Sequence, residues 1–231
     1  MTAITHVIFD MDGVILDSES IYTDVFNSLL SKYNKSYPYE LKRKMMGMKM
    51  DVGMKYIVEK LELGIEPENL IKEYKQLFTE ELWADIKLMP GVKDFIETLH
   101  KNKIPMAIAT GSNTSNFKLK TKKYQAIFDL FHHIVLSDDP EIKNGKPDPD
   151  IYILANQRFE TVPDPKNVLV IEDAVNGVIS GCLAGMRVLW IPDPREPESL
   201  PEEIGKFSTQ ITRIKSLNDF KPEDFGMKIF Q

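Results

Sequence analysis

The sequence has only one cysteine, Cys182, so no disulfide can form within the chain. It also has no apolar run close to the roughly 20 residues that a membrane-spanning helix needs. Residues 1–6 lack the basic and apolar segments of a secretory signal peptide. We therefore expect a protein of a reducing compartment, the cytoplasm, without a membrane partner.

Runs of lysine or arginine are absent as well, and 35 acidic residues outnumber 29 basic ones, which gives a net charge of −6. An acidic chain without a basic stripe is a poor match for nucleic acid. We find no internal repeat and no low-complexity segment. The 231 residues are enough for one large domain or for a domain with a smaller insert. A small molecule is the expected partner, and a monomer is the default expectation.

Short apolar segments rich in β-branched residues recur along the chain, each followed by polar residues, glycine or proline. Such runs are typical of strands buried on both faces of a parallel sheet. Helical periodicity lies between them, so the order of elements predicts an α/β fold with a doubly wound, Rossmann-like parallel sheet. The predicted strands are Thr5–Phe9, Ile104–Ala109, Ile134–Leu136, Val168–Ile171, Val188–Ile191 and Gln210–Ile214. The predicted helices are Asn113–Lys123, Asp148–Phe159, Ala174–Ala184 and one opened by Pro90-Gly91.

The interval between the first two strands is too long for one crossover helix. Apolar residues recur there at spacings of three and four, in Ile21–Leu30, Met54–Leu63 and Leu70–Leu82. We interpret residues 17–88 as a small helical cap domain inserted after the first strand. Residues 1–16 and 89–231 would then form the α/β core.

Two aspartates end the first strand, where Asp10 and Asp12 precede Gly13. Alternate residues of a strand point the same way, and two buried like charges repel each other and are costly to desolvate. Stability alone does not require this arrangement, whereas a divalent cation or a proton-transfer task would explain it.

Polar residues also follow the other strands, and ligands of open α/β sheets bind beyond the carboxyl ends of the strands. Acids at two strand ends can hold Mg²⁺. The amides of Gly111 and Ser112, with Thr110, can bind an anion at a helix start, and Lys146 can neutralise a phosphate oxygen. A carboxylate can attack phosphorus to form an aspartyl-phosphate, while a second acid moves protons.

Each of these residues has a more ordinary explanation when it is taken alone. A turn can contain two acids before a glycine, a threonine can cap a helix, and lysines are usually solvated. Glu172 and Asp173 could simply complement a helix dipole. The combination at successive strand ends favours the functional interpretation.

Asp10-Met11-Asp12-Gly13, Thr110, Lys146 and Glu172-Asp173 occur in the order of the four motifs of the haloacid dehalogenase-like hydrolase superfamily. The chain resembles that superfamily over nearly its whole length. Within it, the chain is most similar to the phosphatases of pseudouridine 5′-phosphate. That similarity also rests on Met46-Gly47, Leu88–Gly91, His133–Leu136, Asp138–Glu141, Gly145–Ile151 and Asp219-Phe220.

The resemblance implies a Mg²⁺-dependent phosphatase that hydrolyses a small phosphomonoester through an aspartyl-phosphate. Asp10 would be the nucleophile and a metal ligand. Asp12 would move protons and lend its backbone carbonyl to the metal. Asp173 would be the other protein ligand of the metal, and Glu172 would support these ligands or occasionally bind the metal itself. Thr110, Gly111, Ser112 and Lys146 would hold the phosphoryl group.

The implied substrate is pseudouridine 5′-phosphate, and three alternatives stay open. A sugar phosphate, glycerol phosphate or FMN could be hydrolysed instead. A phosphomutase resembling β-phosphoglucomutase would use the same motifs, and a binding module would release no phosphate. In the cap, Lys49 is a candidate contact for a polar substrate group, although a solvated lysine is the ordinary explanation.

Overall fold

The computed structural model describes residues 3–45 and 50–228, and these divide into two compact units. The first contains the segment up to Asp17 and the segment from Lys87 onward. The second is the segment Ser18–Ile86. Each unit has its own hydrophobic core, so each is described separately.

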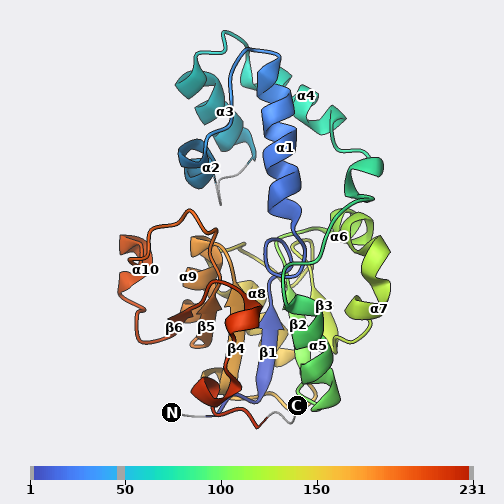
Figure 1. Ribbon diagram of the computed structural model, residues 1–231, viewed down its shortest axis with the longest axis vertical. Helices are drawn as coiled ribbons and strands as arrows, with labels where there is room; N and C mark the ends of the chain where they lie inside the picture. Colours follow the sequence, from blue (N-terminus) through green and yellow to red (C-terminus); the bar gives the residue numbers. More distant parts are fainter. Residues whose placement is uncertain (1–2, 46–49, 229–231) are drawn as a thin grey trace. The chain divides into compact units, whose positions relative to one another are not determined.

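The first unit is built on a parallel sheet of six strands in the order β3-β2-β1-β4-β5-β6 (Figure 1). The order changes direction at β1, which places crossover connections on both sides of it and makes the sheet doubly wound. The predicted fold class is therefore confirmed. The strands are β1 (His6–Phe9), β2 (Met106–Ala109), β3 (His133–Val135), β4 (Val168–Glu172), β5 (Arg187–Trp190) and β6 (Ile211–Arg213).

Helices and short turns connect these strands, and the principal predicted helices are present with shorter ends. Two short helices, α7 and α10, were not predicted because four residues are too few to show periodicity. The helices are α5 (Val92–Lys101), α6 (Thr114–Thr121), α7 (Gln125–Phe128), α8 (Asp150–Gln157), α9 (Val175–Leu183) and α10 (Glu202–Gly205). The 3₁₀ turns are η2 (Lys122–Tyr124), η3 (Pro165–Asn167), η4 (Leu217–Asp219) and η5 (Pro222–Phe225).

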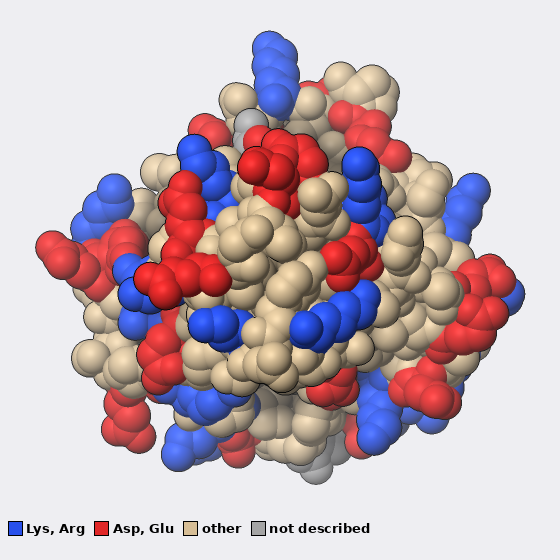
Figure 2. Space-filling model, turned by 90° about the horizontal axis from the view of Figure 1, so that it is seen from above, with Lys and Arg blue, Asp and Glu red and all other residues tan. Residues whose placement is uncertain are grey.

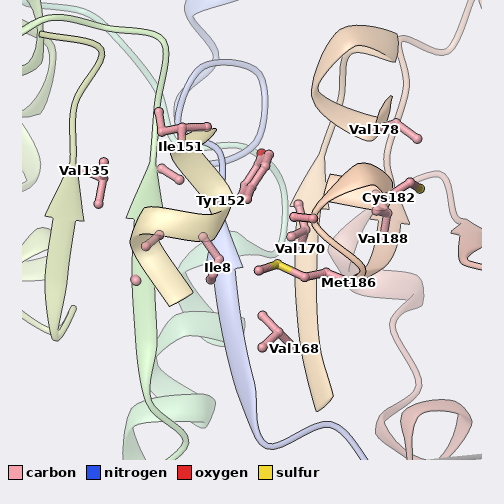
Figure 3. Close-up of a cluster of buried hydrophobic side chains, with 14 of the residues drawn as sticks. Ile8, Val135, Ile151, Tyr152, Val168, Val170, Val178, Cys182, Met186 and Val188 are labelled. Carbon is pink, nitrogen blue, oxygen red and sulfur yellow. The ribbon is translucent and has the colours of Figure 1, made fainter. Parts of the chain in front are cut away.

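Successive residues of β1 enter the cores on opposite faces of the sheet. Ile8 belongs to the cluster that contains Tyr152 of α8 and Val178 of α9 (Figure 3). The ring of Phe9 instead contacts the rings of Phe95 in α5 and Phe131. Burying one large apolar side chain contributes about 1.5–3 kcal/mol, so covering both faces fixes the strand firmly. This explains why the central strands are uninterrupted apolar runs.

The second unit contains helices joined by turns and loops, and no strand among its described residues, as predicted. Its elements are α1 (Ser18–Ser31), α2 (Tyr39–Met45), α3 (Met50–Leu61), α4 (Pro67–Gln76) and the turn η1 (Glu81–Trp83). Phe26 lies between Tyr37 and Tyr74 at ring-centroid distances of 4.5 and 4.9 Å, which centres the core on aromatic contacts.

One predicted helix of this unit differs from the structure. The segment Leu70–Leu82 was expected to be continuous, but α4 ends at Gln76 and only the 3₁₀ turn η1 follows. The aromatic residues Phe78 and Trp83 pack around Tyr22 of α1. These contacts explain why apolar residues recur at helical spacing in a segment that is not one helix. Tertiary packing thus produced a helical pattern in a segment that turns.

The chain leaves and re-enters the first unit at neighbouring positions. Leu16 and Leu88 form an antiparallel bridge. The amide of Asp17 donates to the carbonyl of Lys87 at 2.9 Å, and that of Met89 donates to Ile15 at 2.9 Å. The second unit is the segment Ser18–Ile86; that the inserted segment is a cap domain stays a prediction.

Among the described residues, no helix is long and apolar enough to cross a membrane. On the face drawn in Figure 2, lysine and arginine side chains are interspersed with aspartate and glutamate side chains.

Candidate active site

The candidate residues meet at the carboxyl edge of the sheet because parallel strands all end there. Asp10 follows β1, and its amide extends the ladder by donating to Ile171 at 2.9 Å. Thr110 follows β2, and its amide donates to Val135 at 3.1 Å. Asp173 follows β4, beside β1 in the sheet. Ligands of open α/β sheets bind in this position.

Lys146, from the loop after β3, joins the ends of three strands. Its Nζ donates to Oδ1 of Asp10 at 2.6 Å, to Oε1 of Glu172 at 2.7 Å and to the carbonyl of Ala109 at 3.1 Å. An ammonium has three donors, so these contacts use all of them. Charge-assisted hydrogen bonds of this length are strong, and they fix the lysine against the aspartate.

Burial and charge act against each other at this pair. Burial raises the pKa of Asp10 to about 7, with the charges of Glu172 and Asp12 adding to the rise and Lys146 opposing it. Burial would lower the pKa of Lys146, but the carboxylates of Asp10 and Glu172 outweigh it and raise that pKa. The lysine therefore stays charged.

Glu172 is held on every side of its carboxylate. Oε1 accepts from Lys146 and also from the hydroxyl of Tyr152 at 2.6 Å. Oε2 accepts from the amides of Asp173 and Ala174 at 3.1 and 3.3 Å. The hydrogen bonds of this carboxylate therefore hold Lys146 in place and stabilise the start of α9.

Three acids at this edge could hold a metal ion. Asp10, Glu172 and Asp173 each offer a ligand atom, and these atoms lie within 4.8 Å of one another. The backbone carbonyl of Asp173 accepts from Nε1 of Trp190 at 2.8 Å, which ties the loop to β5. Carboxylate oxygens are preferred ligands of Mg²⁺, so the donor set suits that ion.

Asp12 has a different environment from Asp10. Its Oδ1 accepts from Nζ of Lys120 in α6 at 2.6 Å, and its Oδ2 accepts from the hydroxyl of Ser112 at 2.8 Å. Gly13 adopts a positive φ of 80°, and a Cβ there would lie 2.1 Å from Oδ2 of Asp173. The turn at Gly13 therefore requires glycine. Asp12 is paired with Lys120, whereas Asp10 is paired with Lys146.

The segment Thr110–Ser112 lies where an anion site was expected, and its two hydroxyl groups and the amides of Thr110 and Ser112 already have partners. The hydroxyl oxygen of Thr110 accepts from the amide of Ser112 at 3.1 Å. Thr110 is fully buried, whereas Gly111 is exposed. The side chain of Asn113 caps α6 by accepting from the amide of Asn116 at 2.9 Å.

The sequence-predicted residues are therefore largely brought together. The structure places Asp10, Lys146, Glu172 and Asp173 in one cluster, with Asp12 and Ser112 bonded to each other beside Thr110. Lys49 lies outside the described residues.

Sequence reasoning missed Lys120, Tyr152 and Trp190. Each contacts a predicted site residue. A signal existed for Lys120, because it follows Phe117 by three residues on the predicted helix and so falls on the inward face. Tyr152 and Trp190 resembled ordinary apolar core positions in sequence.

The model of the family described as haloacid dehalogenase-like hydrolase matches residues 7–191. The chain is 42% identical to "(DL)-glycerol-3-phosphatase 1, mitochondrial" of Arabidopsis thaliana, over 99% of this chain and 76% of that one. It is 41% identical to "Probable pseudouridine-5'-phosphatase" of Drosophila melanogaster, over 98% of this chain and 96% of that one.

Among solved structures, a haloacid dehalogenase family hydrolase of Deinococcus radiodurans, crystallised with bound phosphate and sodium, has the same fold. The TM-score is 0.74 at 24% identity, covering 94% of this chain and 92% of that one. This structural likeness supports the fold alone, whereas the matches in sequence support the family and the activity. The chain belongs to the haloacid dehalogenase-like hydrolase family and is a phosphatase, a phosphoric monoester hydrolase, of small phosphorylated substrates.

Proposed function

We propose that this enzyme hydrolyses a small phosphomonoester through an aspartyl-phosphate formed on Asp10, with Mg²⁺ as its cofactor. The observation that carries the proposal is the contact of 2.6 Å between Asp10 and Lys146, beside Asp173 at the carboxyl edge of the sheet. A nucleophilic carboxylate and a fixed cation next to it suit attack on a phosphoryl group.

Asp10 and Asp173 are the proposed side-chain ligands of Mg²⁺, with the backbone carbonyl of Asp12 as a third. Glu172 is better placed as a support, because both of its oxygens already accept hydrogen bonds. When bound, Mg²⁺ supplies positive charge that offsets the repulsion among these acids and stabilises the developing charge on the phosphoryl oxygens.

The reaction then has two steps that balance. In the first, a carboxylate oxygen of Asp10 attacks phosphorus, the ester bond breaks, and protonated Asp12 gives its proton to the leaving alkoxide. In the second, water attacks phosphorus and passes a proton to Asp12. The bond between phosphorus and Asp10 breaks, and inorganic phosphate leaves. Lys146 and the Thr110–Ser112 segment are proposed to hold the phosphoryl oxygens.

Pseudouridine 5′-phosphate is the proposed substrate, supported by the name of the Drosophila relative. Glycerol 3-phosphate is the second candidate, supported by the name of the equally similar Arabidopsis relative. We also propose that the helical segment 18–86 is a cap that closes over the substrate, a usual role for mobile lids, with Lys49 as its candidate contact. The proposed location is the cytoplasm, and the proposed oligomeric state is a monomer.

The test is a phosphate-release screen with Mg²⁺ in which substrates are ranked by kcat/KM. It should include pseudouridine 5′-phosphate, dl-glycerol 3-phosphate, FMN, uridine 5′-monophosphate and glucose phosphates. Pseudouridine 5′-phosphate is expected to rank first. If dl-glycerol 3-phosphate leads, the substrate assignment is wrong but the chemistry stands.

Two outcomes of the same screen would overturn the chemistry. A phosphomutase would convert one glucose phosphate into another while releasing little phosphate, which product chromatography detects. A binding module would release no phosphate from any compound.

A further inference from the structure

We propose that Lys120 is a positioning residue for Asp12, and that together with Ser112 it fixes the carboxylate so that Oδ2 is the oxygen that exchanges protons. This inference rests on the proposed function, in which Asp12 is the acid and base. It concerns a lysine on α6 that lies outside the four motifs.

The burial of Lys120 is the first observation. Its side chain is 1% exposed, although lysine is among the residues least often fully buried. A buried ammonium is costly unless it is paired, and Nζ lies 2.6 Å from Oδ1 of Asp12. A hydrophobic residue at this helix position would pack without that cost, so packing alone does not explain a lysine here.

The second observation is that the contacts form a closed triangle. Nζ of Lys120 also donates to the hydroxyl oxygen of Ser112 at 3.0 Å, and that hydroxyl donates to Oδ2 of Asp12 at 2.8 Å. Both carboxylate oxygens are therefore held by different donors. Rotation of the carboxylate would break at least one of these bonds, so its plane is fixed before substrate arrives.

The two oxygens are not equivalent in this arrangement. An ammonium only donates, so it requires an unprotonated Oδ1. A hydroxyl can donate or accept, and Oδ2 has a second lone pair. Oδ2 can therefore gain and lose a proton while the triangle stays intact. In the first step that proton passes from Oδ2 to the leaving alkoxide, and in the second it returns to Oδ2 from the attacking water.

The experiment compares Lys120→Met, which keeps the length of the side chain without its charge, with Lys118→Met on the exposed side of the same helix. Each variant is assayed with Mg²⁺ on two substrate types. Pseudouridine 5′-phosphate and dl-glycerol 3-phosphate have alkoxide leaving groups that need a proton. The leaving group of 4-nitrophenyl phosphate needs none.

For Lys120→Met we expect kcat on the alkyl phosphates to fall about 10- to 100-fold with little change in KM, as for other supporting contacts of reactive groups. On 4-nitrophenyl phosphate, the first turnover should keep its rate while later turnovers slow, because water attack still uses Asp12. Rapid mixing should then show a burst of 4-nitrophenolate and a phosphoenzyme that hydroxylamine cleaves. Lys118→Met should behave like the wild type.

The outcomes separate this inference from the proposed function. No phosphate release by the wild type overturns both. An active wild type whose Lys120→Met variant loses the same factor in first-turnover rate on both substrate types, or shows no loss on either, overturns the positioning role alone. If Lys120→Met fails to fold, Ser112→Ala is the variant to test instead, because it removes the two contacts that the hydroxyl makes and keeps the backbone amide. The same difference between alkyl and aryl substrates is expected there in the first turnover, and equal losses in first-turnover rate would overturn the role.

Discussion

Gly177 of α9 faces Glu172 so closely that a Cβ on the glycine would lie 1.8 Å from Oε1 of the carboxylate. That carboxylate cannot move away cheaply, because Lys146, Tyr152 and two backbone amides hold it. The absence of a side chain at Gly177 is therefore part of what positions Lys146 against Asp10.

Gly177→Ala is expected to lower activity even though alanine favours helix by about 1 kcal/mol relative to glycine. The new methyl group would displace Glu172 and with it Lys146, so we expect kcat/KM to fall by at least about tenfold, as for other contacts that orient a reactive group. Gly205→Ala in α10 is the matched control, because a Cβ there meets no atom within 4 Å. Equal activity of the two variants would contradict this account.

Asp10→Asn should abolish turnover while leaving the fold intact. An amide is a poor nucleophile, so the loss should exceed about 10⁴-fold, comparable to the removal of other enzymatic nucleophiles. Circular dichroism should be unchanged, because Lys146 keeps its contact with Glu172. Asp24→Asn, on the exposed side of α1, serves as the control. Near-normal Mg²⁺-dependent activity in Asp10→Asn would sink the aspartyl-phosphate mechanism.

Magnesium should raise the thermal unfolding midpoint of the wild type without any substrate. A ligand at 100 times its Kd stabilises the native state by about 2.7 kcal/mol, and each kcal/mol corresponds to about 2–4 °C in a chain of this size. Differential scanning fluorimetry at constant ionic strength measures this shift. In Asp173→Asn the shift should shrink strongly, because one of the three clustered acids has lost its charge. An undiminished shift would place the metal elsewhere.

Protonation of His133 should destabilise the fold. Burial lowers its pKa from 6.5 to about 4, outweighing the opposing bond that Nε2 makes to the carbonyl of Ala155 at 2.8 Å. Between these two values the unfolded chain binds more protons than the folded one. The free energy of unfolding should therefore fall as the pH decreases through this window.

Urea denaturation of His133→Gln across the same range tests this expectation. The variant should lose less stability than the wild type, and it should retain some dependence because the pKa of His6 is also lowered by burial. His100→Gln, at an exposed position on α5, should follow the wild type. Parallel curves for all three proteins would refute the assignment.

The sheet could be predicted from the sequence because its central strands are buried on both faces. Val168–Ile171 and the residues before Asp10 are apolar without interruption, and a helix of the surface would have shown polar positions. The periodicity of Leu70–Leu82 led to the wrong prediction of one continuous helix. Phe78 and Trp83 lie after the end of α4, and their apolar character is explained by their contacts with the ring of Tyr22.

The site divides in the same way. Asp10, Lys146 and Asp173 could be predicted because each follows a strand and the topology must bring strand ends together. Lys120 and Tyr152 could not, since they lie within helices and reach the site only by the way those helices pack. Motifs at strand ends therefore identify the proposed reacting groups, and helix packing supplies the groups that hold them.

The bridge between Leu16 and Leu88 has an evolutionary consequence. The two connecting segments that lead into and out of segment 18–86 are hydrogen-bonded to each other. That segment is therefore topologically equivalent to a long surface loop. Lengthening a loop costs little free energy, roughly 0.6 kcal/mol for each doubling. The α/β scaffold can therefore exchange the whole segment for a shorter or longer one without breaking a single strand pairing. In the proposed cap role, replacement of this segment would change the substrate range while the proposed chemistry at the sheet edge stays the same.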